Sequence, residues 1–210
     1  MRRLAILALA LVAFGAAAAD GERTYVFKAF LDEKSIGAHT FTVATAGTRR
    51  TVTSDAAFDV RILGITAYRY RHHAEEQWSD DCLSSLAAIT DDDGKVGRVT
   101  LAKNGDANEI GGNGVHLSEP GCLMTYAYWS PALREQTRLL NPQTGRVDAV
   151  KVERVGSGRV TVAGREVAAT DWRITGGESP VDVWISAQGD WVGLDSMVSH
   201  GKHKLSYRLP

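Results

Sequence analysis

Apolar and polar residues alternate one by one along much of this chain. The pattern is clearest in residues 25–31, 181–186 and 204–209. Successive side chains of a β-strand point to opposite faces of a sheet, so a period of two predicts strands with one face toward a core. The pattern predicts a mainly β fold.

Short runs that contain Gly, Asn or Asp separate the alternating segments at regular intervals, as is typical of hairpin turns. The predicted turns are Asp32-Glu33-Lys34, Ala46-Gly47-Thr48, Asp92-Asp93-Gly94, Asn104-Gly105-Asp106, Gly156-Ser157-Gly158, Gln188-Gly189-Asp190 and His200-Gly201-Lys202. This spacing predicts a single antiparallel meander that forms a curved sheet, a half-barrel or a barrel. Residues 104–121, rich in Gly and Asn, are expected to form an irregular hairpin or a long loop.

One segment predicts a short helix. Ser130 is suited to the N-cap and Pro131 to the first helical position, while Asn141-Pro142 stops the helix.

The first nineteen residues have the pattern of a secretory signal peptide. Arg2 and Arg3 precede an apolar run, Leu4–Phe14, and small residues follow up to Ala19. The alternative is a first helix that anchors the chain in a membrane, but the run is short for a bilayer. We expect removal of residues 1–19, one mainly β domain over residues 20–210, and a periplasmic or secreted protein.

Charge and hydropathy restrict the partners. The full chain has 24 Lys and Arg against 25 Asp and Glu, and loss of Arg2 and Arg3 leaves 22 against 25, a formal charge of −3. A mildly acidic chain is not expected to bind nucleic acid. No later apolar run approaches the length of a transmembrane segment.

The chain has two cysteines, Cys82 and Cys122. In an oxidising compartment an isolated pair predicts one structural disulfide. Two free thiols are the alternative.

Two aromatic clusters are the candidate ligand-binding residues. On a strand, Tyr68, Tyr70, His72 and Trp78 share one face, which is either an aromatic core face or a concave surface that binds a ligand. The second cluster comprises Tyr126, Tyr128 and Trp129, which either cap the core or form the rim of a pocket.

No pattern indicates a metal site, a cofactor or a catalytic set. His72 and His73 point to opposite faces of a strand and cannot share an ion. Gly156-Ser157-Gly158 is not a nucleophile motif, and Asp91-Asp92-Asp93-Gly94 lacks the downstream Glu of a calcium loop. Whether the protein is an enzyme stays open.

Three segments carry a family resemblance: residues 58–78 (FDVRILGITAYRYRHHAEEQW), 122–131 (CLMTYAYWSP) and 139–147 (LLNPQTGRV). They resemble a family of uncharacterised secreted bacterial proteins, a domain of unknown function. The resemblance implies an envelope location and a mainly β fold. The layout is also similar, more remotely, to periplasmic half-barrel carriers of lipoproteins and lipids.

These observations favour an exported envelope protein that binds a hydrophobic or amphipathic molecule, such as a lipid. One alternative is a structural or assembly factor that binds another envelope protein. The other is an enzyme acting on envelope glycan or lipid.

Overall fold

The computed structural model describes residues 20–210. The predicted signal peptide, residues 1–19, lies outside the described residues. Within residues 20–210, no helix has the length and apolar character needed to cross a membrane.

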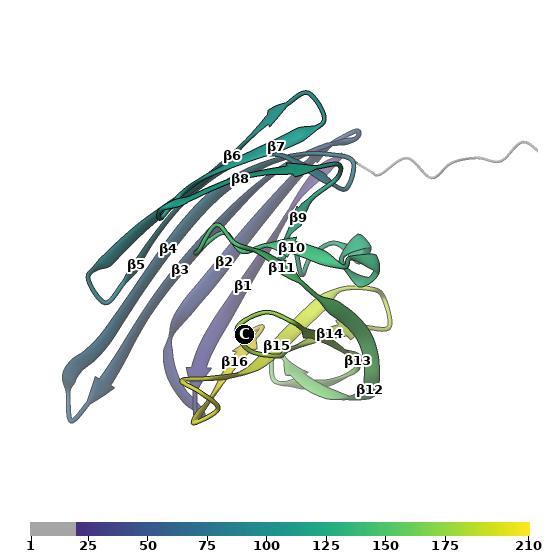
Figure 1. The fold of residues 1–210 in the computed structure, drawn as a ribbon. Helices are drawn as coiled ribbons and strands as arrows, with labels where there is room; N and C mark the ends of the chain where they lie inside the picture. The colour runs from purple at the N-terminus through teal and green to yellow at the C-terminus, as the bar shows by residue number, and fades with distance from the viewer. Residues whose placement is uncertain (1–19) are drawn as a thin grey trace, which may run out of the picture.

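Thirteen strands of the described chain form one antiparallel sheet. The first eight are β1 (Gly21–Leu31), β2 (Lys34–Ala46), β3 (Arg49–Ile62), β4 (Ile65–Ser79), β5 (Cys82–Asp92), β6 (Lys95–Asn104), β7 (Ala107–Gly112) and β8 (Val115–Pro120). The last five are β12 (Lys151–Val162), β13 (Arg165–Thr175), β14 (Val181–Ser186), β15 (Trp191–Val198) and β16 (His203–Arg208). The order is β12-β13-β14-β15-β16-β1-β2-β3-β4-β5-β6-β7-β8 (Figure 1). The predicted mainly β fold of successive antiparallel hairpins is confirmed.

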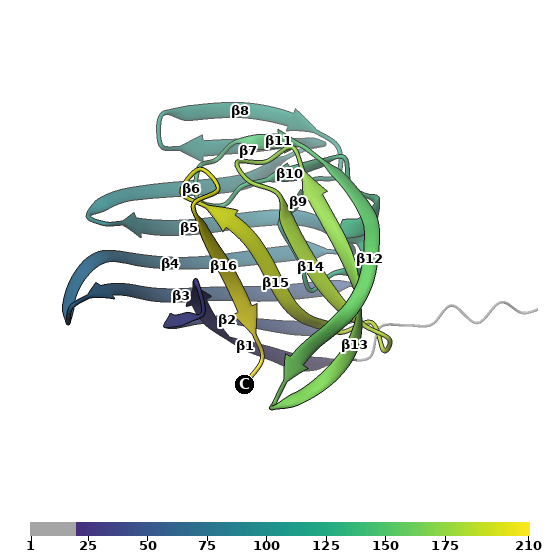
Figure 2. The same ribbon diagram turned by 90° about the horizontal axis from the view of Figure 1, so that it is seen from below.

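The sheet is strongly curved and open. β16 pairs with β1, in a register that places Lys28 opposite Arg208 and Leu31 opposite Leu205. β12 and β8 are the two edge strands of the described sheet and do not pair with each other. Figure 2 shows β12–β16 curling across the concave face of β1–β8. The result is a half-barrel in which two parts of the sheet, β1–β8 and β12–β16, face each other.

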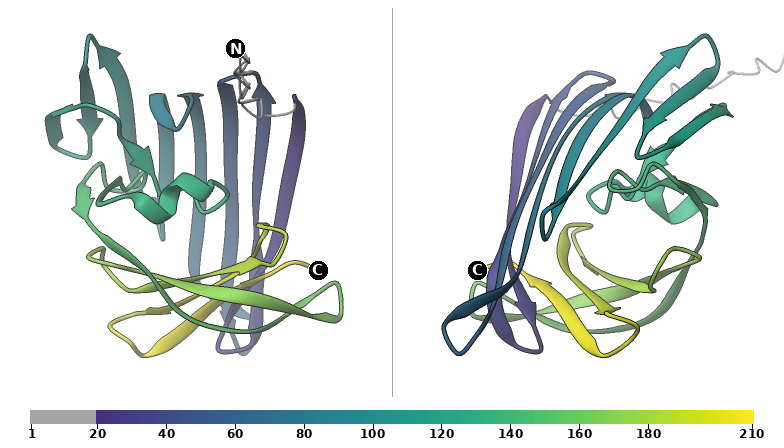
Figure 3. Two further views of the ribbon diagram at one scale, coloured as in Figure 1. Left: turned by 90° about the vertical axis from the view of Figure 1, so that its right-hand side faces the viewer. Right: turned by 60° about the vertical axis from the view of Figure 1, so that its left-hand side comes forward.

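Residues 121–150, here the linking segment, connect β8 to β12 and lie between the two parts of the sheet (Figure 3). They contain β9 (Met124–Thr125), the 3₁₀ helix η1 (Pro131–Glu135), β10 (Arg138–Leu140) and β11 (Val147–Ala149). β9, β10 and β11 form a separate small sheet. The Ser130 side chain accepts a hydrogen bond from the Ala132 backbone N–H, so the predicted short helix and its N-cap are confirmed.

The core fills the space between the concave face and the linking segment. Trp191 is 1% exposed and lies at the centre of an aromatic cluster. Its ring centroid lies 4.3 Å from that of Phe27, 5.0 Å from Phe41 and 5.2 Å from Tyr128. This one side chain therefore packs together β1, β2, β15 and the linking segment.

Cys82 and Cys122 form the predicted disulfide. Cys82 begins β5, and Cys122 lies two residues after β8. Beside the disulfide, the Leu83 backbone N–H donates to the Leu123 carbonyl oxygen at 2.9 Å. These bonds fix the start of the linking segment to the β4–β5 turn.

Two local predictions are wrong. Residues 104–121 form two regular strands, β7 and β8, rather than an irregular hairpin or long loop, because Asn108 donates to the carbonyls of Glu119 and Gly121 and holds them in register. Residues 156–158 are not a turn but lie inside β12. A Cβ on Gly158 would lie 3.1 Å from the Trp184 ring, so this glycine provides room for an indole.

Removing the disulfide should lower stability without changing the fold. The double variant Cys82→Ser, Cys122→Ser opens a loop with a sequence separation of 40. On the chain-entropy model we expect the free energy of unfolding to fall by about 4 kcal/mol. Urea unfolding with and without reductant measures this. Reductant should destabilise the wild type and leave the variant unchanged, and equal stability of both oxidised proteins would contradict the prediction.

Candidate functional site

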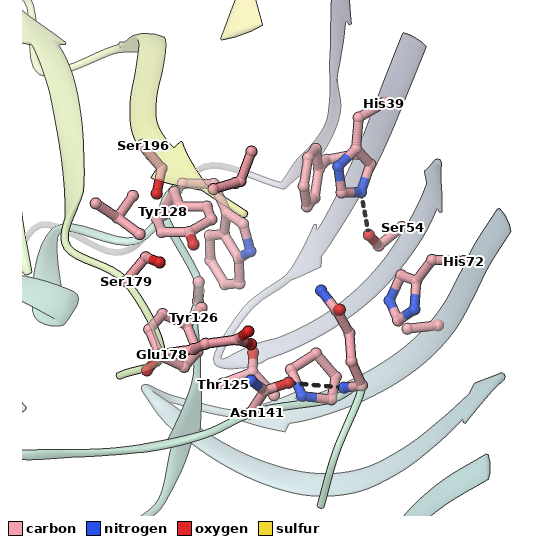
Figure 4. A pocket seen from close by; sticks show the side chains of 18 of the residues that line it. His39, Ser54, His72, Thr125, Tyr126, Tyr128, Asn141, Glu178, Ser179 and Ser196 are labelled. Atoms are coloured by element: carbon pink, nitrogen blue, oxygen red, sulfur yellow. Dashed lines mark hydrogen bonds between the residues drawn. The ribbon is translucent and has the colours of Figure 1, made fainter. Parts of the chain in front are cut away.

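A cavity of about 400 Å³ opens between the concave face and the linking segment (Figure 4). Its floor is formed by β2, β3 and β4, one wall by the linking segment, and the opposite wall by β14, β15 and their adjoining turns. The lining residues are His39, Phe41, Val52, Ser54, His72, Ala74, Glu76, Thr125, Tyr126, Ala127, Tyr128, Trp129, Asn141, Pro142, Gln143, Glu178, Ser179, Val181, Ser196, Val198, Ser199 and His200.

Small side chains on the floor account for the position of the cavity. The register places Phe41 opposite Ser54, and Ser54 opposite Ala74, in one row across three strands. All three side chains alternate toward the concave face and are buried. Ser54 and Ala74 fill little volume, and the linking segment passes over them without filling the space.

His39 is held from both sides of its ring. Its Nε2 lies 2.7 Å from the Ser54 hydroxyl oxygen and its Nδ1 lies 3.1 Å from the Tyr207 hydroxyl oxygen. Burial, with a smaller contribution from the nearby His72, lowers the pKa of His39 to about 3. The imidazole is therefore neutral at physiological pH, with one nitrogen donating and the other accepting.

His72 adds a second neutral imidazole to the floor. Its Nδ1 lies 2.8 Å from the Thr90 hydroxyl oxygen. Burial lowers the pKa of His72 to about 4, with a smaller contribution from His73. If the Thr90 hydroxyl donates to Nδ1, the N–H at Nε2 is a donor available to a ligand.

Glu76 is a carboxyl group inside the protein. It is 5% exposed and accepts a hydrogen bond from Trp78 Nε1 at 2.9 Å. Burial raises the pKa of Glu76 to about 7, although hydrogen bonds with Thr125 and, to a smaller extent, Trp78 act in the opposite direction. This group gains or loses its proton near neutral pH.

The linking segment supplies an aromatic wall. The Tyr126 hydroxyl donates to Asp148 at 2.7 Å, which fixes its ring beside the cavity. Tyr128 packs on Trp191. Trp129 meets Trp78 edge to face, with centroids 5.4 Å apart.

The mouth of the cavity is polar and open to solvent. Gln143, Glu178, Ser199 and His200 line it and are exposed. They come from three separate connections: the β10–β11 turn, the β13–β14 loop and the β15–β16 turn. The lining therefore changes from aromatic and neutral inside to polar at the mouth.

The structure brings four of the seven candidate ligand-binding residues to the cavity: His72, Tyr126, Tyr128 and Trp129. Trp78 is buried behind the wall, against Trp129. Tyr70 stacks on Phe58 at 5.4 Å, away from the cavity. Tyr68 is 36% exposed and donates to Asp92 at 2.6 Å, beyond the end of the core. The shared face of β4 is as predicted, but it runs from the cavity floor out into solvent.

His39, Ser54 and Glu178 were not selected from the sequence. His39 and Ser54 are polar residues at inward positions of alternating strands, and that is the signal that could have found them. The hydrogen bond between His39 and Tyr207 joins residues 168 apart in the sequence, so no local pattern predicts it.

The site can offer apolar contact and uncharged hydrogen bonds. The His39–Ser54 distance is that of a base and a nucleophile, but an imidazole with a pKa of about 3 is a weak base at neutral pH. Residues 20–210 contain no cluster of three His, Cys, Asp or Glu side chains able to hold a metal ion.

Comparison with known proteins agrees with this architecture. The family model described as Domain of unknown function (DUF6134) matches residues 27–209. Comparison with curated protein sequences gives no match. The chain is similar to a crystal structure of a β-barrel-like protein of Domain of Unknown Function DUF1849 from Brucella abortus, with a TM-score of 0.59 and 11% identity over 93% of this chain and 98% of that chain. This likeness shows the fold alone, and the expected resemblance to an uncharacterised domain with barrel-like architecture is confirmed.

Glu76→Gln should change how stability depends on pH. Between about pH 4.5 and 7 the native protein holds a proton on Glu76 that the unfolded chain has released, because burial raises this pKa to about 7. The native state binds more protons, so the Glu76 contribution falls as pH rises through this window, by up to about 3 kcal/mol, and is constant above it.

The Gln variant has no such proton to lose. Its free energy of unfolding, relative to that of the wild type, should therefore increase as the pH rises from about 5 to 7.5. Urea unfolding at several pH values measures the difference. The lowered pKa values of His39 and His72 remove stability as pH falls below about 6.5, but both proteins share them. A difference that is constant with pH would contradict the prediction.

Proposed function

The chain belongs to the family described as Domain of unknown function (DUF6134), and we propose that this member binds a small amphipathic molecule in the cavity between β2–β4 and the linking segment. The observation that carries the proposal is the lining of the cavity. Aromatic and aliphatic side chains lie beside two uncharged imidazoles, His39 and His72, and beside Glu76, whose pKa is raised to about 7. A ligand with both apolar surface and hydrogen-bonding groups matches such a lining.

The size of the cavity supports a small-molecule ligand. Its volume of about 400 Å³ lies within the range of about 300–1,000 Å³ found for small-molecule sites. Phe41, Val52 and Trp129 offer apolar contact, and the edge of His72 offers a hydrogen bond. A purely hydrocarbon ligand would leave His72 Nε2 without a partner, because only Nδ1 of this ring is bonded within the protein, and an unpaired buried polar atom carries an energetic cost.

The electrostatics of the cavity favour a ligand without a strong charge in its buried part. The two imidazoles are neutral because burial lowers the pKa of each well below neutral pH. Glu76 would repel a buried anion when it is ionised. A charged headgroup fits better at the mouth, among Gln143, Ser199 and His200, where water can solvate it.

The compartment is part of the proposal. The Cys82–Cys122 disulfide favours an oxidising, exported compartment. An exported protein meets envelope molecules, among which single-chain amphiphiles combine an apolar body with a polar end. We therefore propose an envelope amphiphile as the ligand class.

Filling the cavity from its floor should abolish binding. Ala74 is 1% exposed, lines the cavity and lies opposite Ser54, so Ala74→Leu places a larger side chain in the ligand space. We expect the affinity for a fluorescent fatty-acid probe to fall by about tenfold or more. Titration of the probe measures this, and native mass spectrometry of gently purified protein measures loss of any co-purifying ligand.

Ala87→Leu is the matched control. Ala87 lies on β5 and is exposed, so the same change there should leave probe binding unaltered. Thermal unfolding of both variants establishes that they are folded. A wild type that purifies without ligand and does not bind the probe would overturn the proposal, and one dominant protein crosslinked in cells would then favour an assembly factor.

A further inference from the structure

The β3–β4 hairpin extends beyond the strands on both of its sides. β2 pairs with β3 only as far as Phe58, and β5 pairs with β4 only as far as Tyr70. Residues 59–69, here the β3–β4 finger, pair only with each other, apart from bonds from the β5–β6 turn at the base. Figure 1 shows the finger projecting from one end of the sheet. Its tip lies about 15 Å beyond the last shared row of strands.

The tip of the finger is apolar and solvated. Leu63 is 98% exposed, Ile65 73% and Ile62 62%. These are the three most exposed large apolar side chains in the described part of the chain. They lie next to one another at a single convex point.

Backbone conformation makes Leu63 unusual at this position. It occupies the first turn position with φ +50°, followed by Gly64 with φ +83°. Such two-residue turns favour Asn or Asp before Gly. The β5–β6 and β7–β8 turns of this protein follow that preference, with Asp93-Gly94 and Asn113-Gly114, whereas the β12–β13 turn has the small apolar pair Ala163-Gly164. Leu63 therefore suits neither the turn nor the solvent, and a role in binding would account for it.

The finger has a small excess of positive charge in a chain that is acidic overall. Residues 59–69 contain Arg61 and Arg69 against one acidic residue, Asp59. Arg69 and Arg71 pair with Asp59 at the base. Asp92 and Asp93 also lie near the base, on the β5–β6 turn. The charge nearest the apolar tip is that of Arg61.

We infer that the β3–β4 finger inserts its tip into the surface of an anionic lipid membrane. Ile62, Leu63 and Ile65 enter the acyl boundary, and Arg61 meets the phosphate groups. Tyr68 lies farther back, at the depth of the headgroups that suits an amphipathic ring. The edges of the finger carry backbone groups that need water, so insertion is limited to the tip.

The shape of the tip favours a membrane over a protein partner. Three side chains on a convex point offer far less area than the roughly 800 Å² per partner of a stable protein interface. A fluid lipid layer needs no complementary groove. The positive charge beside the tip also matches anionic headgroups.

The cavity mouth lies at the same end of the molecule. The β15–β16 turn, which contributes Ser199 and His200 to the mouth, adjoins the β1–β2 turn, because the Asp32 backbone N–H donates to the Lys204 carbonyl at 2.9 Å. In an antiparallel meander the β1–β2, β3–β4 and β5–β6 turns share one end, and Figures 1 and 2 show the β15–β16 turn there too. Docking by the finger would bring the mouth near the lipid, although the inference does not depend on a cavity ligand.

Leu63→Asn separates membrane binding from folding. Asn-Gly is a preferred pair for this turn, so the variant should unfold at the same temperature as the wild type or higher. Its partition onto vesicles of phosphatidylglycerol and phosphatidylcholine in equal parts should fall about tenfold or more, because the apolar tip is lost. Co-sedimentation with the vesicles measures this partition. Mass spectrometry of each protein identifies its N-terminal residue, so that only proteins beginning at the same residue are compared.

Two further variants complete the experiment. Val155→Asp, at an exposed apolar position on β12, should bind vesicles as the wild type does. Arg61→Gln should weaken binding to the mixed vesicles and leave binding to pure phosphatidylcholine unchanged. The inference is overturned if wild-type protein does not sediment with the mixed vesicles, or if Leu63→Asn binds them as well as the wild type. Self-association that Leu63→Asn removes, without vesicle binding, would identify a second copy as the occupant instead.

Discussion

An open sheet must cover its own concave face, and this constraint organises the rest of the molecule. β12 and β8 do not meet, so side chains on the inner face would remain solvated without a cover. The linking segment supplies it, with Leu123, Met124, Leu139 and Leu140 at or below 1% exposure. The disulfide and the packing around Trp191 hold this cover in place. Closure is achieved by side-chain burial rather than by a final ladder of hydrogen bonds.

The same cover produces the cavity. A segment of irregular structure cannot follow every contour of the sheet, and space remains where the floor residues are small, at Ser54 and Ala74. His39, His72 and Glu76 on its floor are largely withdrawn from water, so burial shifts their pKa values toward the neutral form. The pKa of Glu76 is raised, which favours the neutral carboxyl group, and that of His39 is lowered, which favours the neutral imidazole. Fold and candidate site are thus two results of one arrangement.

Local patterns predicted the strands, the short helix and the disulfide, because each depends on neighbouring residues or on the compartment. Alternation also assigned the inward face of β4 correctly. It could not show that β4 outruns its neighbours, so Tyr68 was grouped with His72 although one is solvated and the other buried. Gly158 was assigned to a turn because its partner, the Trp184 ring, lies on another strand. The His39–Ser54–Tyr207 contacts join β2, β3 and β16, which no local pattern relates.

The pairing of β16 with β1 is expected to determine the sequence of folding events. Hairpins from β1 to β8 join neighbours in sequence and are expected to form early, whereas β1 gains its second neighbour only after β16 is available. Until then residues 28–31 of β1 lack this neighbour, and Tyr25 and Phe27 lack the Trp191 ring that covers them, so apolar surface that favours aggregation is exposed. A sheet arranged in this way completes its core when β16 docks, so the slowest event in its folding is expected to be the pairing of β16 with β1.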